Sequence, residues 1–272
     1  MNDCSWPDAD FIRKGILVKY ILIFILVFIS GCSEKDWVPP NNPDPSDILK
    51  QASNDTRSGN YKDALSKHIW FHENALEYRQ SLTGVRLSFA LGDWHDLAKK
   101  YPPAMRALVA AGDTALGNVQ KEIDTFNAFH DYSSINRELD TMAKTVELFI
   151  WLDKNHPKQA RKVYPIAQEA LIEAKQYSLS GKYIEPQRTF LKAIRVVEVL
   201  KRSYASTDAN SNREDRAYWH FSESIPTLVA LLILNNRKEE AEELVEQALL
   251  EWENAGFKRK LNIALEGKFL YE

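Results

Sequence analysis

The chain has 272 residues, of which 44% are hydrophobic and 27% are charged, and its formal net charge is −3. This composition excludes an intrinsically disordered chain, and the presence of only 10 Gly and 11 Pro excludes collagen-like and low-complexity sequence. The slightly acidic balance argues against nucleic-acid binding, which calls for a clearly basic face. Low glycine content together with abundant Leu, Ala, Glu and Lys favours an all-α fold, because these residues lose little entropy in a helix.

A basic segment and then a hydrophobic segment precede Cys32. Residues 13–19 contain one arginine and two lysines, residues 20–29 read YILIFILVFI, and Ser-Gly-Cys follows. Ten apolar residues are too few to span a bilayer, which takes about 20. A basic region, a short apolar region and small residues before a cleavage site are typical of a secretory signal. The alternative is an uncleaved anchor with an incidental cysteine.

Residues 29–32, Ile-Ser-Gly-Cys, resemble the lipobox of bacterial lipoproteins. The resemblance implies that a diacylglycerol is attached to the Cys32 thiol, that the chain is cleaved after Gly31, and that the new amino terminus is acylated, for example with palmitate. We therefore expect residues 1–31 to be a signal peptide, and the lipidated chain to be stably attached to a membrane. Three aspartates in the first seventeen residues are unusual in such a signal, and translation from Leu17 or Val18 would remove them.

A proline-rich spacer follows the lipidation site. Residues 32–46 contain four prolines interspersed with Asn and Asp, so we expect an extended tether that reaches roughly 40 Å at about 3.1 Å per residue. By resemblance to lipoprotein sorting, Ser33 is not the aspartate associated with inner-membrane retention. We therefore favour the outer membrane, facing the periplasm, in an organism with two membranes. With only Cys4 and Cys32 in the sequence, the mature chain cannot form an internal disulfide.

A repeated motif predicts the architecture of the remainder. Residues 59–65, GNYKDAL, recur 33 positions later as residues 92–98, GDWHDLA. This pattern resembles the tetratricopeptide (TPR) family, whose repeat has 34 residues. The resemblance implies antiparallel helix hairpins stacked as a superhelix, an α-solenoid, over residues 47–272, with each glycine at a turn and each aromatic residue packed on a preceding helix. Fainter echoes at 155–160, 181–183 and 236–241 do not keep the 34-residue spacing.

The spacing of hydrophobic residues and the positions of prolines and turn-forming residues predict ten helices in this part of the chain. The expected ranges are 46–58, 60–80, 82–91, 93–100, 103–126, 134–153, 157–177, 184–204, 213–234 and 237–254. Pro103 and Pro226 suit first-turn positions, whereas Pro165 should kink or divide its helix. The run 228–234 is apolar all round, so it must be buried between neighbours. Residues 205–212 are expected to form a loop.

His68 and His72 are the most distinctive polar pair. They are separated by four residues, a spacing at which two imidazoles on one helix can share a metal ion. A helical wheel over residues 60–80 places both, together with Arg79, at the centre of the apolar face. Polar groups in that position must be hydrogen-bonded, bind a ligand or line a groove. No third metal ligand is identifiable, so we predict no metal or other cofactor and favour an interhelical hydrogen-bond network.

Trp70 falls on the opposite, polar face of the same predicted helix. It either covers the next helix or offers a contact to a partner, since Trp is enriched in binding hot spots. We prefer packing, because single exposed apolar residues are common. His68, Trp70, His72 and Arg79 are nevertheless the candidate binding residues.

No spacing of nucleophiles, acids or bases selects a reaction, so we predict no catalytic residue and no enzyme. The expected function is that of a membrane-tethered interaction or scaffold module that binds an unidentified protein or peptide in the cell envelope. The alternative is an envelope enzyme, or a receptor for a small ligand or a metal, that uses the histidine-containing helical interior.

Overall fold

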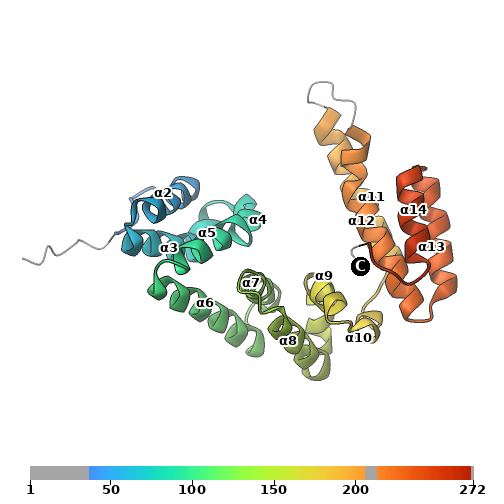
Figure 1. Cartoon of the computed structure of the whole chain (residues 1–272), viewed down its shortest axis with the longest axis horizontal. Coiled ribbons are helices and arrows are strands. Elements are labelled where there is room, and N and C mark those ends of the chain that lie inside the picture. The colour runs from blue at the N-terminus through green and yellow to red at the C-terminus, as the bar shows by residue number, and fades with distance from the viewer. Residues whose placement is uncertain (1–36, 206–212, 271–272) are drawn as a thin grey trace, which may run out of the picture. The chain divides into compact units, whose positions relative to one another are not determined.

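The computed structural model describes residues 37–205 and 213–270. Thirteen α-helices and one short 3-10 helix, but no strand, occur in these ranges, which confirms the predicted all-α class (Figure 1). The chain divides into two units, Met1–Pro43 and Asp44–Glu272, and every described helix lies in the second. Cys32, the predicted signal peptide and nearly all of the predicted loop lie outside the described residues.

The helices follow one another with short connections. In the first half they are α2 (Pro45–Ser58), α3 (Tyr61–Tyr78), η1 (Gln80–Leu82), α4 (Thr83–Arg86), α5 (Phe89–Ala98), α6 (Pro102–Gln120) and α7 (Thr125–Glu138). In the second half they are α8 (Met142–Asn155), α9 (Pro157–Glu173), α10 (Tyr177–Gly181), α11 (Pro186–Ala205), α12 (Arg213–Leu234), α13 (Lys238–Glu251) and α14 (Ala255–Ala264).

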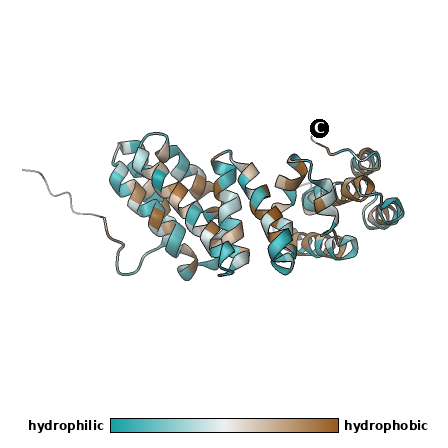
Figure 2. Cartoon of the chain, turned by 90° about the horizontal axis from the view of Figure 1, so that it is seen from below, coloured by the Kyte–Doolittle hydropathy of each residue, from teal (hydrophilic) through white to brown (hydrophobic). Residues whose placement is uncertain are grey.

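Most helices pack against the helix that precedes or follows them in the chain. The main pairs are α2 with α3, α5 with α6, α6 with α7, α8 with α9, and α11 with α12. Helix α3 also packs against α5, α7 against α9, and α12 against both α13 and α14. Figure 2 shows that hydrophobic and hydrophilic residues alternate along the helices, as expected where one side of each helix is buried. Short connections between amphipathic helices favour such local packing.

Helix α2 illustrates how the sequence sets the element ends. The Asp44 carboxylate accepts hydrogen bonds from the backbone N–H groups of Ser46 (2.8 Å) and Asp47 (3.4 Å), while Pro45 occupies the first turn. Gly59 ends the helix with φ of 85°, a left-handed conformation that glycine adopts without steric cost. Gly59 therefore forms the turn predicted from the repeat. Pro45, which we had assigned to the tether, is buried and begins the folded unit.

The repeat prediction is wrong at Gly92, and several helix boundaries differ from those expected. Gly92 lies inside α5 and not at a turn between helices. The predicted helix 103–126 ends at Gln120, and the predicted helix 134–153 is interrupted near Asp140. Left-handed residues other than glycine form both interruptions, with φ of 58° at Glu122, 42° at Asp124 and 55° at Asp140. Two of these three residues are aspartates, which tolerate this conformation, but the predicted helices 103–126 and 134–153 run through both.

Two prolines are accommodated inside helices. Helix α9 continues through Pro165, which does not divide it, and α12 continues through Pro226, which is not in a first turn as predicted. A proline removes one backbone hydrogen bond from a helix interior, so the surrounding packing must compensate for this loss. Helix α14 was not predicted; the Asn254 side chain caps it by accepting from the N–H of Gly256 (2.8 Å).

Helix α12 contains a long buried apolar run. By length and composition, Glu214–Leu234 is the one helix in the described residues that could cross a membrane, but 61% of its apolar window is buried inside the protein. Leu228 is 3% exposed and Val229, Ala230, Leu231 and Leu232 are 0% exposed. The prediction that this apolar run is buried is therefore confirmed for residues 228–232, whereas Ile233 is half-buried and Leu234 is 37% exposed at the end of the helix.

Gly181 is expected to tolerate no side chain. A Cβ at this position would overlap the Asn235 side-chain amide, which donates to the backbone carbonyls of Tyr177 (3.0 Å) and Leu231 (2.8 Å) and so joins α10 to the end of α12. Gly181→Ala should lower the free energy of unfolding by about 1–3 kcal/mol. Urea denaturation measures this change.

Gly117 is the matched control, because it lies inside α6 and a Cβ there would meet no atom within 4 Å. Gly117→Ala should leave stability unchanged or raise it by up to about 1 kcal/mol. Equal destabilisation by both substitutions would contradict the assigned contact between Gly181 and Asn235.

Candidate functional site

His68 and His72 lie side by side on α3 and both contact Trp94 of α5. The His68 ring is stacked on Trp94 at 6.3 Å between centroids, and the His72 ring meets it edge-on at 5.8 Å. Trp94 is 2% exposed, and its indole N–H donates to the Ala104 carbonyl at 3.2 Å. Trp94 thus packs on a preceding helix, as the repeat motif predicted. The two histidines share one aromatic neighbour.

The hydrogen-bond network predicted for these histidines is absent from the described part of the chain. Nε2 of His68 and Nδ1 of His72 are buried without a hydrogen-bond partner there. Burial lowers the pKa of His68 to about 4, against a smaller opposing effect of Asp93. Burial and the nearby Arg86 guanidinium lower the pKa of His72 to about 4, which Asp131 partly opposes. Both imidazoles are therefore neutral at pH 7.

Arg79 does not share the histidine face, contrary to the prediction. Helix α3 ends at Tyr78, and Arg79 has an extended backbone with φ of −153°. Its guanidinium binds the Asp44 carboxylate (3.0 Å) and the Ser46 hydroxyl (3.0 Å) at the start of α2. Helical periodicity does not apply beyond the last helical residue, which is why the wheel misplaced Arg79.

Trp70 is half-buried and packs within the protein. Its ring lies 5.7 Å from that of Tyr78, and it borders the hydrophobic cluster that contains Phe71 and Ala75. This arrangement agrees with the packing interpretation that we preferred for Trp70.

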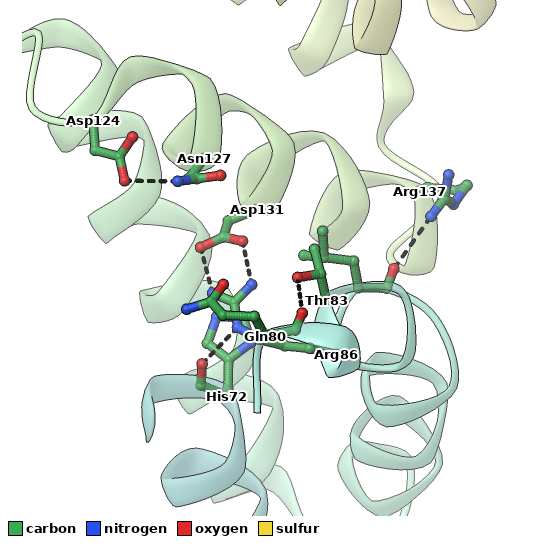
Figure 3. Close-up of polar contacts among 9 residues, drawn as sticks. His72, Gln80, Thr83, Arg86, Asp124, Asn127, Asp131 and Arg137 are labelled. Atoms are coloured by element: carbon green, nitrogen blue, oxygen red, sulfur yellow. Dashed lines mark hydrogen bonds and ion pairs between the residues drawn. The ribbon is translucent and has the colours of Figure 1, made fainter. Parts of the chain in front are cut away.

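An ion pair missed by the sequence reasoning joins α4 to α7. Arg86 donates from its two terminal nitrogens to the two carboxylate oxygens of Asp131, at 2.6 and 2.7 Å, and its Nε donates to the backbone carbonyl of His72 at 2.7 Å (Figure 3). The Arg86 and Asp131 side chains are only 12% and 19% exposed. A bidentate pair of this kind fixes both position and orientation. The ion pair, together with the bond to His72, therefore joins α3, α4 and α7 next to His72.

A pocket of about 410 Å³ opens beside this ion pair. Residues of α3, α4, α6 and α7 line it, and its polar lining includes His72, Glu73, Arg86, Asp124, His130 and Asp131. His130 lies against Phe126 at 6.4 Å between ring centroids, and burial lowers its pKa while the adjacent Asp131 opposes the shift. The volume is in the range typical of small-ligand sites. His72 is the one sequence-predicted candidate that lines this pocket.

The described residues provide no metal centre at the histidine pair or elsewhere. In residues 37–205 and 213–270, no three His, Cys, Asp or Glu side chains converge as metal ligands. Metal sites in proteins take three or four such ligands. His68 and His72 are thus held by aromatic contacts with Trp94, and His72 also lines the pocket.

Comparisons with known proteins give no further information on the site. The chain matches no protein-family model, no curated protein and no solved structure.

The histidine pair should make stability depend on pH. Because both pKa values are lower in the folded protein than the usual 6.5, the unfolded chain binds more protons between pH 6.5 and pH 4. Their contribution to stability is therefore complete above pH 6.5 and is lost as the pH falls towards 4, by about 3 kcal/mol per histidine. Urea denaturation at pH 7, 5.5 and 4 measures this loss.

Replacing both residues, His68→Gln with His72→Gln, should flatten this pH profile, whereas His220→Gln at an exposed position of α12 should leave it unchanged. A parent profile that the double substitution does not alter would show that other groups cause the acid sensitivity.

Proposed function

We propose that this protein is a lipid-anchored helical-repeat lipoprotein that acts as an interaction or scaffold module in the cell envelope. The observation that carries the proposal is the order of features before the folded unit: a basic segment, the apolar residues 20–29, and Ile-Ser-Gly-Cys ending at Cys32. A proline-rich tether then follows Cys32 and ends at Pro43, where the folded unit begins. Two acyl chains or more would make the attachment stable.

Two features support a TPR-like α-solenoid. Helices contact mainly their neighbours in the chain, which is the contact pattern of repeat proteins. In addition, the hydrophobic clusters share helices: α6 contributes Ala104 and Leu108 to one cluster and Ala115 and Val119 to the next. Such continuity is expected where each repeat buries its apolar side on the following one.

Exposed hydrophobic side chains support binding to a protein or peptide. Phe89, Trp219 and Leu250 are 76%, 65% and 83% exposed, and two of them, Phe89 and Trp219, are aromatic residues of the kind enriched in protein interfaces. The pocket beside His72 favours a second candidate, a receptor for a small ligand. We prefer the interaction module, because a repeat array offers a long surface to a partner, and we propose the periplasmic face of the outer membrane as its location.

The anchor is tested by Cys32→Ser in the full-length chain expressed in a bacterium. The parent should incorporate radiolabelled palmitate, sediment with membranes and give crosslinked adducts with envelope proteins. Cys32→Ser should lose the label and the membrane association, because no other cysteine remains in the mature chain. Electrophoresis of labelled fractions measures both effects.

Cys4→Ser is the matched control and should behave as the parent does, because Cys4 lies in the proposed signal peptide. If Cys32→Ser were labelled and fractionated like the parent, the lipoprotein assignment would be wrong. If the parent gave no protein adducts in cells, the interaction function would be wrong even with the anchor in place.

A further inference from the structure

We propose that the pocket between α3, α4, α6 and α7 binds an organic cation on an aliphatic stem, namely an arginine or lysine side chain of a partner peptide. The proposal deepens the interaction function above and rests on it. Four properties of the lining support it: its charge, the placement of its carboxylates, an unused buried nitrogen and its apolar walls.

The lining is net negative. It contains three carboxylates, from Glu73, Asp124 and Asp131, against one guanidinium, that of Arg86. Arg86 neutralises Asp131 in the bidentate pair. Within the described ranges, Glu73 and Asp124 have no ion-pair partner. Because His72 and His130 add no positive charge at pH 7, a cation is the ligand that complements this surface.

Acidic groups lie at the start and in the first turns of α7. Asn127 and Asp131 are four residues apart and share a face of the helix, whereas Asp124 precedes the helix with φ of 42° and is linked to that face through Asn127. Figure 3 shows the Asp131 carboxylate facing the Arg86 guanidinium, with Asn127 and Asp124 following towards the start of the helix. Asn127 donates to the Asp124 carboxylate at 2.8 Å, which orients that carboxylate. Negative charge is thus carried at the start of α7 and on its first turns.

One residue of the same lining carries an unused nitrogen. His72 lines the pocket, and its Nδ1 is buried without a hydrogen-bond partner in the described residues. In the tautomer with the proton on Nε2, Nδ1 accepts a hydrogen bond, and ammonium and guanidinium groups offer only donors. A bound cation that reached this nitrogen would satisfy a polar atom that has no partner among the described residues.

The walls suit an aliphatic stem better than a bare ion. Leu76, Leu87 and Ile123 line the pocket, and the stems of Arg and Lys bury well against such surfaces. The carboxylates of the described residues do not converge as a metal site does, so a compact divalent ion would not contact enough of them. The volume of about 410 Å³ accommodates one long side chain.

Isothermal titration of the full mature lipoprotein in detergent tests the proposal with capped tripeptides. The probes are acetyl-Gly-Arg-Gly-amide and its lysine analogue, with citrulline and norleucine peptides as uncharged controls. The cationic peptides should bind at least about tenfold more tightly, equivalent to about 1.4 kcal/mol. Glu73→Gln combined with Asp124→Asn should weaken their binding about tenfold without changing the thermal melt.

The matched control is Glu77→Gln combined with Asp113→Asn, which removes two exposed carboxylates from α3 and α6 outside the pocket lining and should not alter binding. Equal affinity for the arginine and citrulline peptides, or equal effects of the two double variants, would overturn the proposal. Tighter binding of free spermidine than of either peptide would assign the pocket to a small amine and also overturn it. If the parent protein bound none of the cationic peptides but still gave crosslinked adducts in cells, this inference alone would be refuted and the interaction function would stand.

Discussion

The bidentate ion pair between Arg86 and Asp131 is the interaction on which the candidate site depends. It connects residues 45 positions apart, and the third guanidinium donor binds the His72 backbone, so α3, α4 and α7 are held together at one point. Charges this well removed from water are costly unless they are paired, and removing one partner from a buried pair typically costs about 3–5 kcal/mol. The pair therefore fixes the helix positions that shape the pocket. Among the residues that the structure describes, it leaves Glu73 and Asp124 as the lining carboxylates without a counter-ion.

The helices show that local sequence patterns predict the existence of a helix more reliably than the residues at which it begins and ends. Helix α12 has the predicted limits, because its apolar run and the polar segment before it are both visible in the sequence. The ends of α6 and α7 were misplaced because Glu122 and Asp140 adopt left-handed conformations, which glycine or asparagine would normally mark. Pro226 was placed in a first turn by local rules, whereas burial of the following residues on all sides maintains the helix through it.

The candidate site could be predicted only in part. The spacing of His68 and His72 correctly singled out a polar pair on a buried face, but the centre of that face lies nearer to Ala64, Phe71 and Ala75. Lys67, a charged residue of the same helix, is 6% exposed because its ammonium pairs with Asp55 of α2. Partners from other helices, such as Trp94 and Asp131, are set by tertiary packing, and no periodicity within α3 contains that information.

These features are consistent with the proposal of a tethered binding protein. Helices packed on their chain neighbours supply a framework, and the histidine pair and Trp94 fill the interior between α3 and α5. The ion pair between Arg86 and Asp131 lies beside this interior and lines an acidic pocket. The buried, neutral imidazoles keep positive charge out of the pocket at pH 7. The same residues thus serve the packing of the fold and the charge of the proposed binding surface.

A double-mutant cycle of Arg86→Met and Asp131→Asn, followed by urea denaturation at pH 7, tests the central role of the ion pair most directly. The account predicts that each single substitution is strongly destabilising and that the double variant is more stable than their sum implies, with a coupling of at least about 1.5 kcal/mol. Effects that add to within about 0.5 kcal/mol would contradict it.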